Sequence, residues 1–313
     1  MRAIVYDRYG SPEVLESRLL PSPQPGPGEV LLSVRAAALN PKDSLIRKGK
    51  FRRMTGDRFP RQLGFDVAGV VHALGPGVTR FRPGDEVFGM KHGWAGGTVA
   101  EEVCLSLDEL ALKPKRLSFE EAAAVPLAGL TALQALRDEG RLTTGQRVIL
   151  HGASGGVGVF ATQVARLLGA QVTTTSSARN VALCLQLGAH EAWDYTEKTG
   201  LAKGSNWDVF FDVFGNRGFG EVRGALSSKG TYVSTVPSVT IAVQHLATHL
   251  TSKRARLVVV KPNPVDLELL AKWCDEGKLK PVLDRVFPFT EVAEAQALIE
   301  TRRARGKVII RVG

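Results

Sequence analysis

The sequence predicts an α/β protein whose central part forms a doubly wound parallel sheet. The strand-like segment Val148–His151 runs into a glycine-rich turn, and a helix of apolar period follows and ends at Gly169. A second strand is expected at Gln171–Thr175, and strands and helices then alternate to about Val260. Before Ser118, short strands and turn signals follow one another instead. The chain therefore predicts a β domain and a separate nucleotide-binding domain.

The β region ends where the first helical signal appears. Ser118 and Glu121 form a capping box, in which each residue bonds the other's backbone N–H at a helix start, and Ala128–Arg137 continues as helix. Before that point, glycine and proline turn signals separate short apolar segments. The strands expected there include Ala3–Tyr6, Glu29–Ala37 and Val67–Leu74.

The C-terminal tail resumes a mixed pattern after the parallel sheet. We expect it to return to the first domain, because its strands are short and separated from the alternating region. Its expected elements are a helix at Pro264–Asp275, a strand at Asp284–Phe287, a helix at Glu291–Arg303 and a strand at Lys307–Val312.

The glycine turn carries the strongest functional signal in the chain. Gly152, Gly155 and Gly158 are spaced three apart, which lets a backbone turn tightly under a pyrophosphate. Free amides at the N-terminus of the following helix would face the phosphate charge, and Gly158 would allow close packing of helix on strand. The residues expected to line the pyrophosphate are Gly152, Ser154, Gly155, Gly156 and Val157.

The same turn also fits a hydrolase. Gly152-Ala153-Ser154-Gly155-Gly156 matches the G-x-S-x-G nucleophile elbow, with Ser154 as the nucleophile. Asp212 with His245 or His249 could complete a triad, but the two histidines lie at helical spacing, which an ordinary helix face explains. The third glycine has no required role in an elbow, so the spacing favours the dinucleotide site.

The end of the second strand predicts the cofactor. In a dinucleotide fold, an acidic residue about 20 residues past the glycines bonds the ribose 2′-hydroxyl and would repel a 2′-phosphate. Here the segment Thr173–Arg179 contains no acid. Ser176, Ser177 and Arg179 supply two hydroxyls and a guanidinium, which suit a dianionic phosphate. The alternative is a solvated loop with a serine cap; the composition favours NADPH over NADH.

Composition and charge argue against membrane-spanning, disulfide-rich and nucleic-acid-binding classes of protein. The chain has 313 residues, of which 44% are hydrophobic, and no apolar run long enough to cross a bilayer. Its three cysteines are far apart, which suggests the reducing cytoplasm. The net charge of +10 allows some affinity for nucleic acid, but the basic residues are dispersed and no aromatic ladder accompanies them. A nucleic-acid partner is therefore not expected, and the anionic cofactor accounts for part of the charge.

With these residues in view, the whole chain resembles the medium-chain dehydrogenase/reductase superfamily, in its zinc-free quinone oxidoreductase and 2-alkenal (enone) reductase branch. The resemblance covers nearly every residue and rests on several motifs taken together. They are Arg8–Leu15, Pro27–Leu31, Ala38–Asp43, Gly64–Val71, Phe81–Gly89, Gly129–Ala132, the glycine loop, and Gly277–Val282.

The resemblance implies a GroES-like β domain, residues 1–120 and 263–313, split by a Rossmann domain, residues 121–262. NADPH would bind between them, and the substrate would be a small quinone or an α,β-unsaturated carbonyl. Family members usually form homodimers by joining Rossmann sheets edge to edge. Leu257–Val260 is the candidate edge, although a buried central strand would look the same.

The chain departs from the zinc-dependent branch of the superfamily. That branch has a cysteine near position 40 and a Gly-His-Glu near position 64, where this chain has Asn40 and Gly64-Phe65-Asp66. The cysteines of the structural zinc lobe are also missing, and Asp66 alone cannot supply the three or four ligands that zinc needs. We therefore expect no metal.

The family match also implies site residues. Asn40 would lie where nicotinamide meets substrate, with Lys42 and Asp43 as neighbouring candidates for catalytic, ribose or substrate contacts. Cofactor contacts are further implied at Thr131, Tyr195, Phe214 and Gly215. Reduction of an enone or quinone needs no Lewis acid, because hydride attacks an electron-poor carbon. The alternatives are an NADPH-dependent carbonyl or alcohol oxidoreductase on the same fold, or a non-catalytic nucleotide- or RNA-binding protein.

Overall fold

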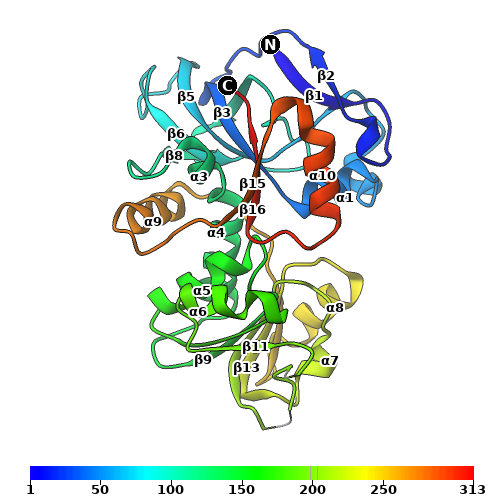
Figure 1. The fold of residues 1–313 in the computed structure, drawn as a ribbon, viewed down its shortest axis with the longest axis vertical. Helices are drawn as coiled ribbons and strands as arrows, with labels where there is room; N and C mark the ends of the chain where they lie inside the picture. The colour runs from blue at the N-terminus through cyan, green and yellow to red at the C-terminus, as the bar shows by residue number, and fades with distance from the viewer. Residues whose placement is uncertain (198, 203) are drawn as a thin grey trace. The chain divides into compact units, whose positions relative to one another are not determined.

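The computed structural model describes residues 1–197, 199–202 and 204–313, which divide into two compact units (Figure 1). The first unit comprises Met1–Leu127 and Lys261–Gly313, and the second comprises Ala128–Val260. The chain thus leaves the first unit once and returns to it. None of the described helices is both long and apolar enough to span a membrane.

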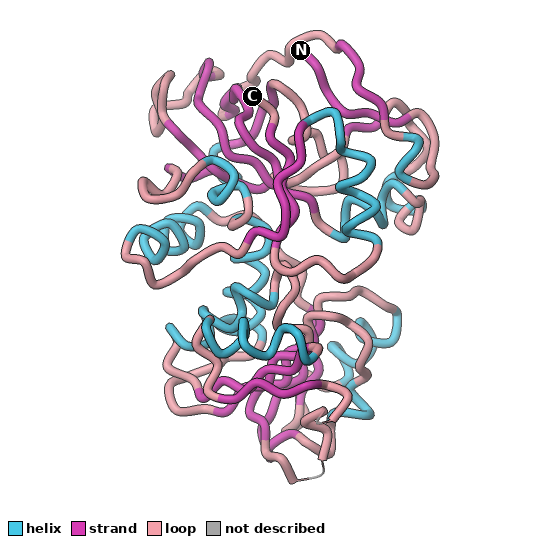
Figure 2. The backbone as a smooth tube through the Cα atoms, in the orientation of Figure 1, coloured by secondary structure: helices cyan, strands magenta, loops and turns pink. Residues whose placement is uncertain are grey.

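The second unit is built on a six-stranded sheet in which every described pairing is parallel (Figure 2). The strand order is β11-β10-β9-β12-β13-β14, so the chain winds outward in both directions from β9 and β12. This order confirms the doubly wound sheet. The strands are β9 (Arg147–His151), β10 (Gln171–Ser176), β11 (Glu191–Asp194), β12 (Trp207–Asp212), β13 (Leu226–Ser234) and β14 (Arg254–Leu257).

Described helices connect β9 to β10, β10 to β11, β12 to β13 and β13 to β14. Because the crossovers leave from β9 and β12 in opposite directions, the turns after these two strands diverge at the carboxyl edge of the sheet, where doubly wound folds bind ligands. The unit's helices are α4 (Pro126–Leu133, entering from the first unit), α5 (Gly158–Leu167), α6 (Val181–Gln186), α7 (Phe219–Val222) and α8 (Val239–Ala247). A π-helical turn, Gln134–Glu139, extends α4.

The last strand of this sheet begins earlier than expected. β14 covers Arg254–Leu257 and pairs with β13, whereas the sequence suggested Leu257–Val260. Val258 N still donates to Ser234 O, but the chain then leaves the sheet. The apolar run Leu257–Val260 predicted the wrong bounds, because the register with β13 and not β-propensity decides which residues pair. The pairing begins at Arg254, opposite Thr231. β14 is nevertheless an edge strand.

The first unit contains a largely antiparallel seven-stranded sheet and a three-stranded sheet. Its helical segments are α1 (Pro41–Arg47), α2 (Arg52–Thr55), α3 (Phe119–Ala123), α9 (Pro264–Asp275) and α10 (Val292–Glu300). The small sheet has the order β2-β1-β4, from Glu16–Leu19, Arg2–Tyr6 and Arg61–Gln62. The large sheet has the order β15-β16-β3-β5-β6-β8, with β7 on β3; its strands are β3 (Glu29–Leu39), β5 (Asp66–Leu74), β6 (Glu86–Met90), β7 (Glu102–Ser106), β8 (Leu110–Leu112), β15 (Leu283–Pro288) and β16 (Lys307–Arg311).

The tail returns to the first unit, as expected. β16 pairs antiparallel with β3, and Val308 lies opposite Leu39 in the register. α9 has the expected bounds, whereas α10 ends at Glu300, three residues before the expected end at Arg303. The helix stops because Arg302 adopts a left-handed backbone, with φ of 55°.

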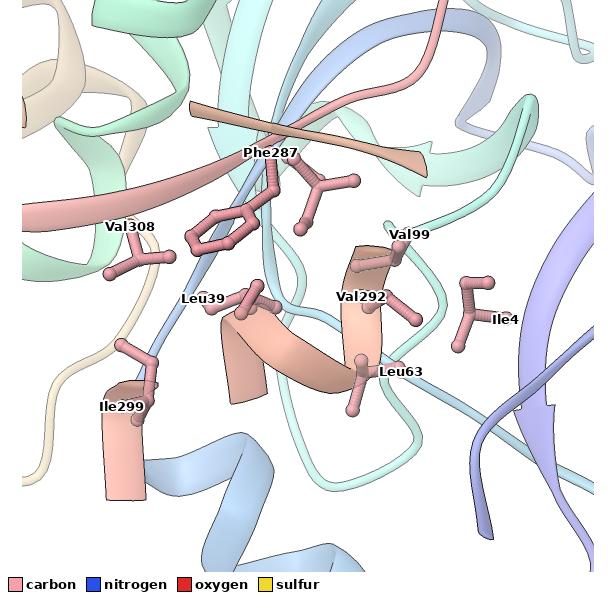
Figure 3. Close-up of a cluster of buried hydrophobic side chains, with 11 residues drawn as sticks. Ile4, Leu39, Leu63, Val99, Phe287, Val292, Ile299 and Val308 are labelled. Carbon is pink, nitrogen blue, oxygen red and sulfur yellow. The ribbon is translucent and has the colours of Figure 1, made fainter. Parts of the chain in front are cut away.

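An apolar cluster holds these returning strands in place. Leu39 from β3, Val308 from β16, Phe287 from β15 and Ile299 from α10 gather in it (Figure 3), each less than a tenth exposed. Burying a side chain of this size contributes about 1.5–3 kcal/mol. Because Leu39 and Val308 directly adjoin Asn40 and Lys307, the cluster also sets the positions of two polar residues.

Candidate active site

The turn between β9 and α5 has the shape that the glycine spacing predicts. Gly152 has a φ of 85°, which side chains rarely tolerate. A Cβ on Gly158 would lie 2.4 Å from Gly152 O, so only glycine lets α5 start this close to the strand. A Cβ on Gly155 would meet only Gly152 O, at 3.6 Å, so the space above it is open. Ser154, Gly156 and Val157 complete the turn.

A buried asparagine joins this turn to the loop after β10. Asn180 Nδ2 donates to Ser154 Oγ at 2.9 Å and to Ser177 Oγ at 3.2 Å. Asn180 is only 5% exposed, and its Oδ1 has no hydrogen-bond partner among the described residues. Ser176 is also buried, while Arg179 is exposed. The loop expected to hold the 2′-phosphate is therefore tied directly to the glycine turn.

His151, the last residue of β9, forms side-chain hydrogen bonds at the carboxyl edge of the sheet. Its Nε2 lies 2.9 Å from Asn216 Oδ1, which can only accept, so Nε2 carries the proton. Its Nδ1 lies 2.8 Å from Thr175 Oγ1 and accepts from that hydroxyl. Burial lowers the pKa of His151, although Asp212 opposes the effect. The neutral ring thus links the ends of β9 and β10 to the turn after β12.

The turn after β12 is shaped by Asp212. Its carboxylate accepts Gly215 N at 2.7 Å and Arg217 N at 2.8 Å, so the backbone folds back on the side chain. Gly215 takes a φ of 73° in this turn, and the neighbouring Phe214 is 41% exposed. Tyr232 Oη also donates to Asp212, at 3.3 Å. These hydrogen bonds hold the turn together, and Phe214 within it is partly open to solvent.

The remaining expected cofactor residues also belong to the second unit. Tyr195 follows β11, is 46% exposed, and its N donates to Ser176 O at 2.9 Å. Thr131 is buried in α4. The glycine turn, Ser176, Ser177, Tyr195, Phe214 and Gly215 therefore share one edge of the sheet, as a bound dinucleotide requires. Open space over Gly155 and a loop without a carboxylate at Ser177–Asn180 fit a phosphorylated dinucleotide.

The hydrolase triad is not assembled. The hydroxyl of Ser154 bonds Asn180, and the carboxylate of Asp212 is used in its own turn. His245 Nδ1 accepts from Leu257 N at 3.1 Å, which ties α8 to β14. These nominated residues therefore serve local structure.

In the first unit, Asn40 lies at the centre of a buried polar network. Lys307 Nζ donates to Asn40 Oδ1 at 2.6 Å, and Asn40 Nδ2 donates to Asp66 Oδ2 at 2.9 Å. Lys307 also bonds Asp66 Oδ2 directly, at 3.0 Å. Asp66 Oδ1 accepts Leu127 N at 2.7 Å. The amide of Asn40 is thus fixed on both sides, and the residue is only 3% exposed.

The carboxylate of Asp43 accepts hydrogen bonds from two backbone N–H groups. Its Oδ2 accepts Asn40 N at 2.6 Å, and its Oδ1 accepts Gly64 N at 3.1 Å. It is 1% exposed, so both oxygens are used inside the protein instead of facing a ribose or a substrate. Burial raises the pKa of Asp43 to about 7, although the Asn40 N–H and Lys307 oppose the shift.

Lys42 is the more accessible of the three candidate catalytic residues. Its Nζ donates to Gly93 O at 2.7 Å and lies 3.7 Å from the centre of the Phe65 ring. The centre of the Trp94 ring is 5.2 Å from the same nitrogen. Burial lowers the pKa of Lys42, and the neighbouring Asp43 and Asp66 oppose that effect. Lys42 is a half-buried ammonium with an increased tendency to release its proton.

Comparison with known proteins decides the family. One family model, described as an alcohol dehydrogenase GroES-like domain, matches residues 26–115, and another, described as a zinc-binding dehydrogenase, matches residues 187–310. The chloroplast envelope quinone oxidoreductase homolog of Arabidopsis thaliana is 34% identical over 323 residues, covering 99% of this chain and 98% of the relative. The NADPH-dependent alkenal/one oxidoreductase of the same plant is 35% identical, covering 99% of this chain and 79% of that protein.

A solved structure agrees along the whole chain. The quinone oxidoreductase from Coxiella burnetii superposes with a TM-score of 0.92 at 34% identity, covering 100% of this chain and 99% of that one. The chain belongs to the medium-chain dehydrogenase/reductase superfamily, in its quinone oxidoreductase and enone reductase branch. The GroES-like and Rossmann folds expected from the sequence are confirmed, and this protein is an oxidoreductase.

The description of one matching family model names zinc. Among residues 1–197, 199–202 and 204–313, no three His, Cys, Asp or Glu side chains are grouped so that they could hold a metal ion. Asn40 and Asp66 occupy positions compared above with the zinc-dependent branch. In this oxidoreductase the ammonium group of Lys307 bonds both side chains. Freedom from zinc stays a prediction that elemental analysis tests.

Sequence reasoning missed three polar residues of this oxidoreductase. Lys307 was placed only on a strand, His151 only in an apolar run, and Asn180 not at all. A charged residue at the start of an otherwise apolar strand was the one available signal for Lys307. Asn180 had none, because its partners depend on how two loops meet.

Proposed function

We propose that this protein is an NADPH-dependent, zinc-independent reductase of a quinone or an α,β-unsaturated carbonyl. The observation that carries the proposal is the carboxyl edge of the second unit's sheet. There, an open glycine turn is tied through Asn180 to a hydroxyl-rich loop without a carboxylate. The relatives of this chain support it, since they include quinone oxidoreductases and an NADPH-dependent alkenal/one oxidoreductase.

The second unit would hold the cofactor. The amides after Gly152 and at the start of α5 would face the pyrophosphate. Ser176, Ser177 and Arg179 would bind the 2′-phosphate, and a guanidinium can donate to it twice. Tyr195 would lie at the adenosine phosphate, and Thr131, Phe214 and Gly215 near the nicotinamide. A mycobacterial relative, 27% identical with a TM-score of 0.85, was solved in complex with NADPH.

The first unit would supply the groups around Asn40. When bound, NADPH supplies a hydride, which would go to the electron-poor β-carbon of the substrate. Lys42 would then give its Nζ proton to the enolate, because it is a half-buried ammonium with a lowered pKa. Asn40 would lie where the nicotinamide meets the substrate, and Asp43 would hold Asn40 through the backbone. Solvent would return a proton to Lys42.

A kinetic assay tests this function. Loss of nicotinamide absorbance is followed with NADPH and a panel of quinones, enones, aldehydes and simple alcohols. Turnover of a quinone or enone, unchanged after chelator treatment and with no stoichiometric metal, supports the proposal. Asn40→Ala should slow hydride transfer more than it weakens NADPH binding. Reduction of aldehydes alone would favour the carbonyl reductase alternative, and loss of turnover on chelation would contradict zinc independence.

We further propose that the protein is a homodimer joined along β14. In the described sheet β14 pairs only with β13, and α8 lies against it. Val239, Val243 and Leu246 share one face of α8 and are 83%, 59% and 78% exposed. Such an apolar stripe beside an open edge suits a second copy of this chain. Leu246→Glu should give a monomer in sedimentation experiments, whereas Leu185→Glu, on α6, should not.

The location of the protein is proposed to be the cytoplasm. Its three cysteines, Cys104, Cys184 and Cys274, form no disulfide, which suits a reducing compartment. The relatives' names include mitochondrial and chloroplastic proteins, so cell fractionation is the deciding measurement. Recovery with an organelle fraction would contradict the proposal.

A further inference from the structure

The ion pair of Lys307 and Asp66 is almost completely removed from water. The two side chains are 3% and 0% exposed, and their charged atoms lie 3.0 Å apart. Desolvation of two charges offsets much of their attraction, so apolar residues of similar volume are often at least as stabilising. The fold alone therefore does not explain why this position of β16 carries a lysine.

What the pair does is orient one amide. Lys307 donates to Asn40 Oδ1 at 2.6 Å, and Asp66 accepts from Asn40 Nδ2 at 2.9 Å. The opposite orientation would place the NH2 group against an ammonium and the amide oxygen against a carboxylate. The two charges therefore select one of the two orientations that an asparagine could otherwise adopt.

The effect extends to the start of α1. Asn40 is the N-cap of this helix, and its backbone N donates to Asp43 Oδ2 at 2.6 Å. Lys42, the proposed proton donor, lies within the same turn. Because β16 enters from the C-terminal tail, Lys307 links this turn to a strand that pairs with β3. Displacing the ammonium would disturb Asn40 first and the helix start next.

We propose that Lys307 is a positioning residue of the reduction, whose ammonium, paired with Asp66, holds the Asn40 amide in its working orientation. The inference rests on the proposed function, because it assigns Asn40 a part in that reaction. Lys307 acts through Asn40 and is itself enclosed by protein. Displacing a reacting group by about 1 Å can cost on the order of a hundredfold in rate, so the effect should appear in kcat.

The test uses the full-length protein and its best quinone or enone substrate. The double variant Asp66→Asn/Lys307→Met removes both charges of the pair together, so neither partner is left as an unpaired buried charge. We expect it to unfold cooperatively and to bind NADPH within about threefold of the parent in a fluorescence titration. Its kcat should fall about thirty- to a hundredfold. The separate single variant Lys307→Arg keeps the charge and the donors. Its kcat should therefore stay within about fivefold of the parent.

Lys113 provides a matched control in the same unit. Its side chain is 5% exposed and its Nζ lies 3.1 Å from Glu86. Lys113→Met should leave kcat within about twofold. A double variant that retains kcat within threefold, or a Lys113→Met variant that loses as much activity, would overturn the positioning role. A parent without reductase activity would instead refute the proposed function, so the two failures are distinguishable.

A pH profile gives a second readout if the double variant does not fold. Lys307→Gln keeps a donor for Asn40 but removes a cation that opposes protonation of Asp43. The acid limb of its kcat profile should therefore move to higher pH. The other charged or titratable groups acting on Asp43, namely Lys42, Asp66 and Tyr6, are unchanged in this variant. An unmoved acid limb would contradict the proposal, because it would show that the charge of Lys307 is not coupled to the Asn40–Asp43 turn on which turnover is proposed to depend.

Discussion

Lys307 Nζ lies 3.0 Å from Asp66 Oδ2, although 241 positions separate the two residues in the chain. The contact joins the start of β16 to the start of β5, and both strands belong to the sheet that contains β3. A charge pair so enclosed makes the stability of the first unit depend on the presence of both partners, because either charge left alone would be buried without compensation.

Lys307→Met should lower the free energy of unfolding by about 3–5 kcal/mol, since it leaves Asp66 buried and unpaired. Asp66→Asn/Lys307→Met should recover most of that loss. Urea unfolding followed by circular dichroism measures both. A single variant that loses less than about 1 kcal/mol would mean that the pair is far better hydrated than its burial implies.

Arg179→Ala should weaken NADPH binding about ten- to a hundredfold, because a charge-assisted bond to a phosphate contributes roughly 1.5–3 kcal/mol. NADH binding should hardly change, since it has no 2′-phosphate. Titration calorimetry with both cofactors measures the difference. Arg166→Ala, on α5, is the control and should leave both affinities alone. Equal affinity of the parent for NADPH and NADH would refute the cofactor assignment.

Two glycines of the turn after β9 should respond differently to alanine. Gly158→Ala places a Cβ 2.4 Å from Gly152 O and should cost about 1–3 kcal/mol of stability. Gly155→Ala meets only Gly152 O at 3.6 Å, so stability should change little. NADPH affinity should nevertheless drop more than tenfold, because the methyl group occupies the proposed pyrophosphate position. Thermal unfolding and calorimetry separate the two effects. Retained NADPH affinity in Gly155→Ala would contradict the phosphate assignment.

Asp43 should make the folded state less stable as pH rises from about 4 to 7. Its pKa is raised to about 7 in the folded protein, so between these values the folded state binds more protons than the unfolded state. The contribution of Asp43 to the free energy of unfolding is full below its ordinary pKa of about 3.9 and is lost above pH 7. The total loss across this range is about 4 kcal/mol. The difference in unfolding free energy between the parent and Asp43→Asn, measured across this range, should decline accordingly. A flat difference would mean that Asp43 titrates normally.

Ser154 should not react as a nucleophile. Its hydroxyl accepts from Asn180, and none of the nominated histidines bonds it in the described part of the chain. A fluorophosphonate probe, read by mass spectrometry, should therefore leave Ser154 unlabelled, and esterase substrates should not turn over. Stoichiometric labelling would revive the hydrolase interpretation.

Local sequence determined the elements whose signals lie within a few residues. The glycine spacing after β9 specified a turn that only glycine can make, because Gly152 needs a positive φ and Gly158 has no room for a Cβ. Ser118 and Glu121 likewise specified the start of α3, since each bonds the other's backbone. Strand and helix periods were enough to predict a doubly wound sheet, whose order the structure confirms.

Contacts between distant segments were decided by the tertiary structure alone. Lys307 and Asn40 meet because β16 pairs with β3, and nothing near either residue specifies that pairing. Asn180 reaches Ser154 only because β10 lies beside β9 in the sheet. The start of β14 at Arg254 depended on register with β13, which overrode the apolar run that follows. Periodicity and turn chemistry are properties of neighbours in sequence, whereas burial and charge pairing arise only when the chain has folded.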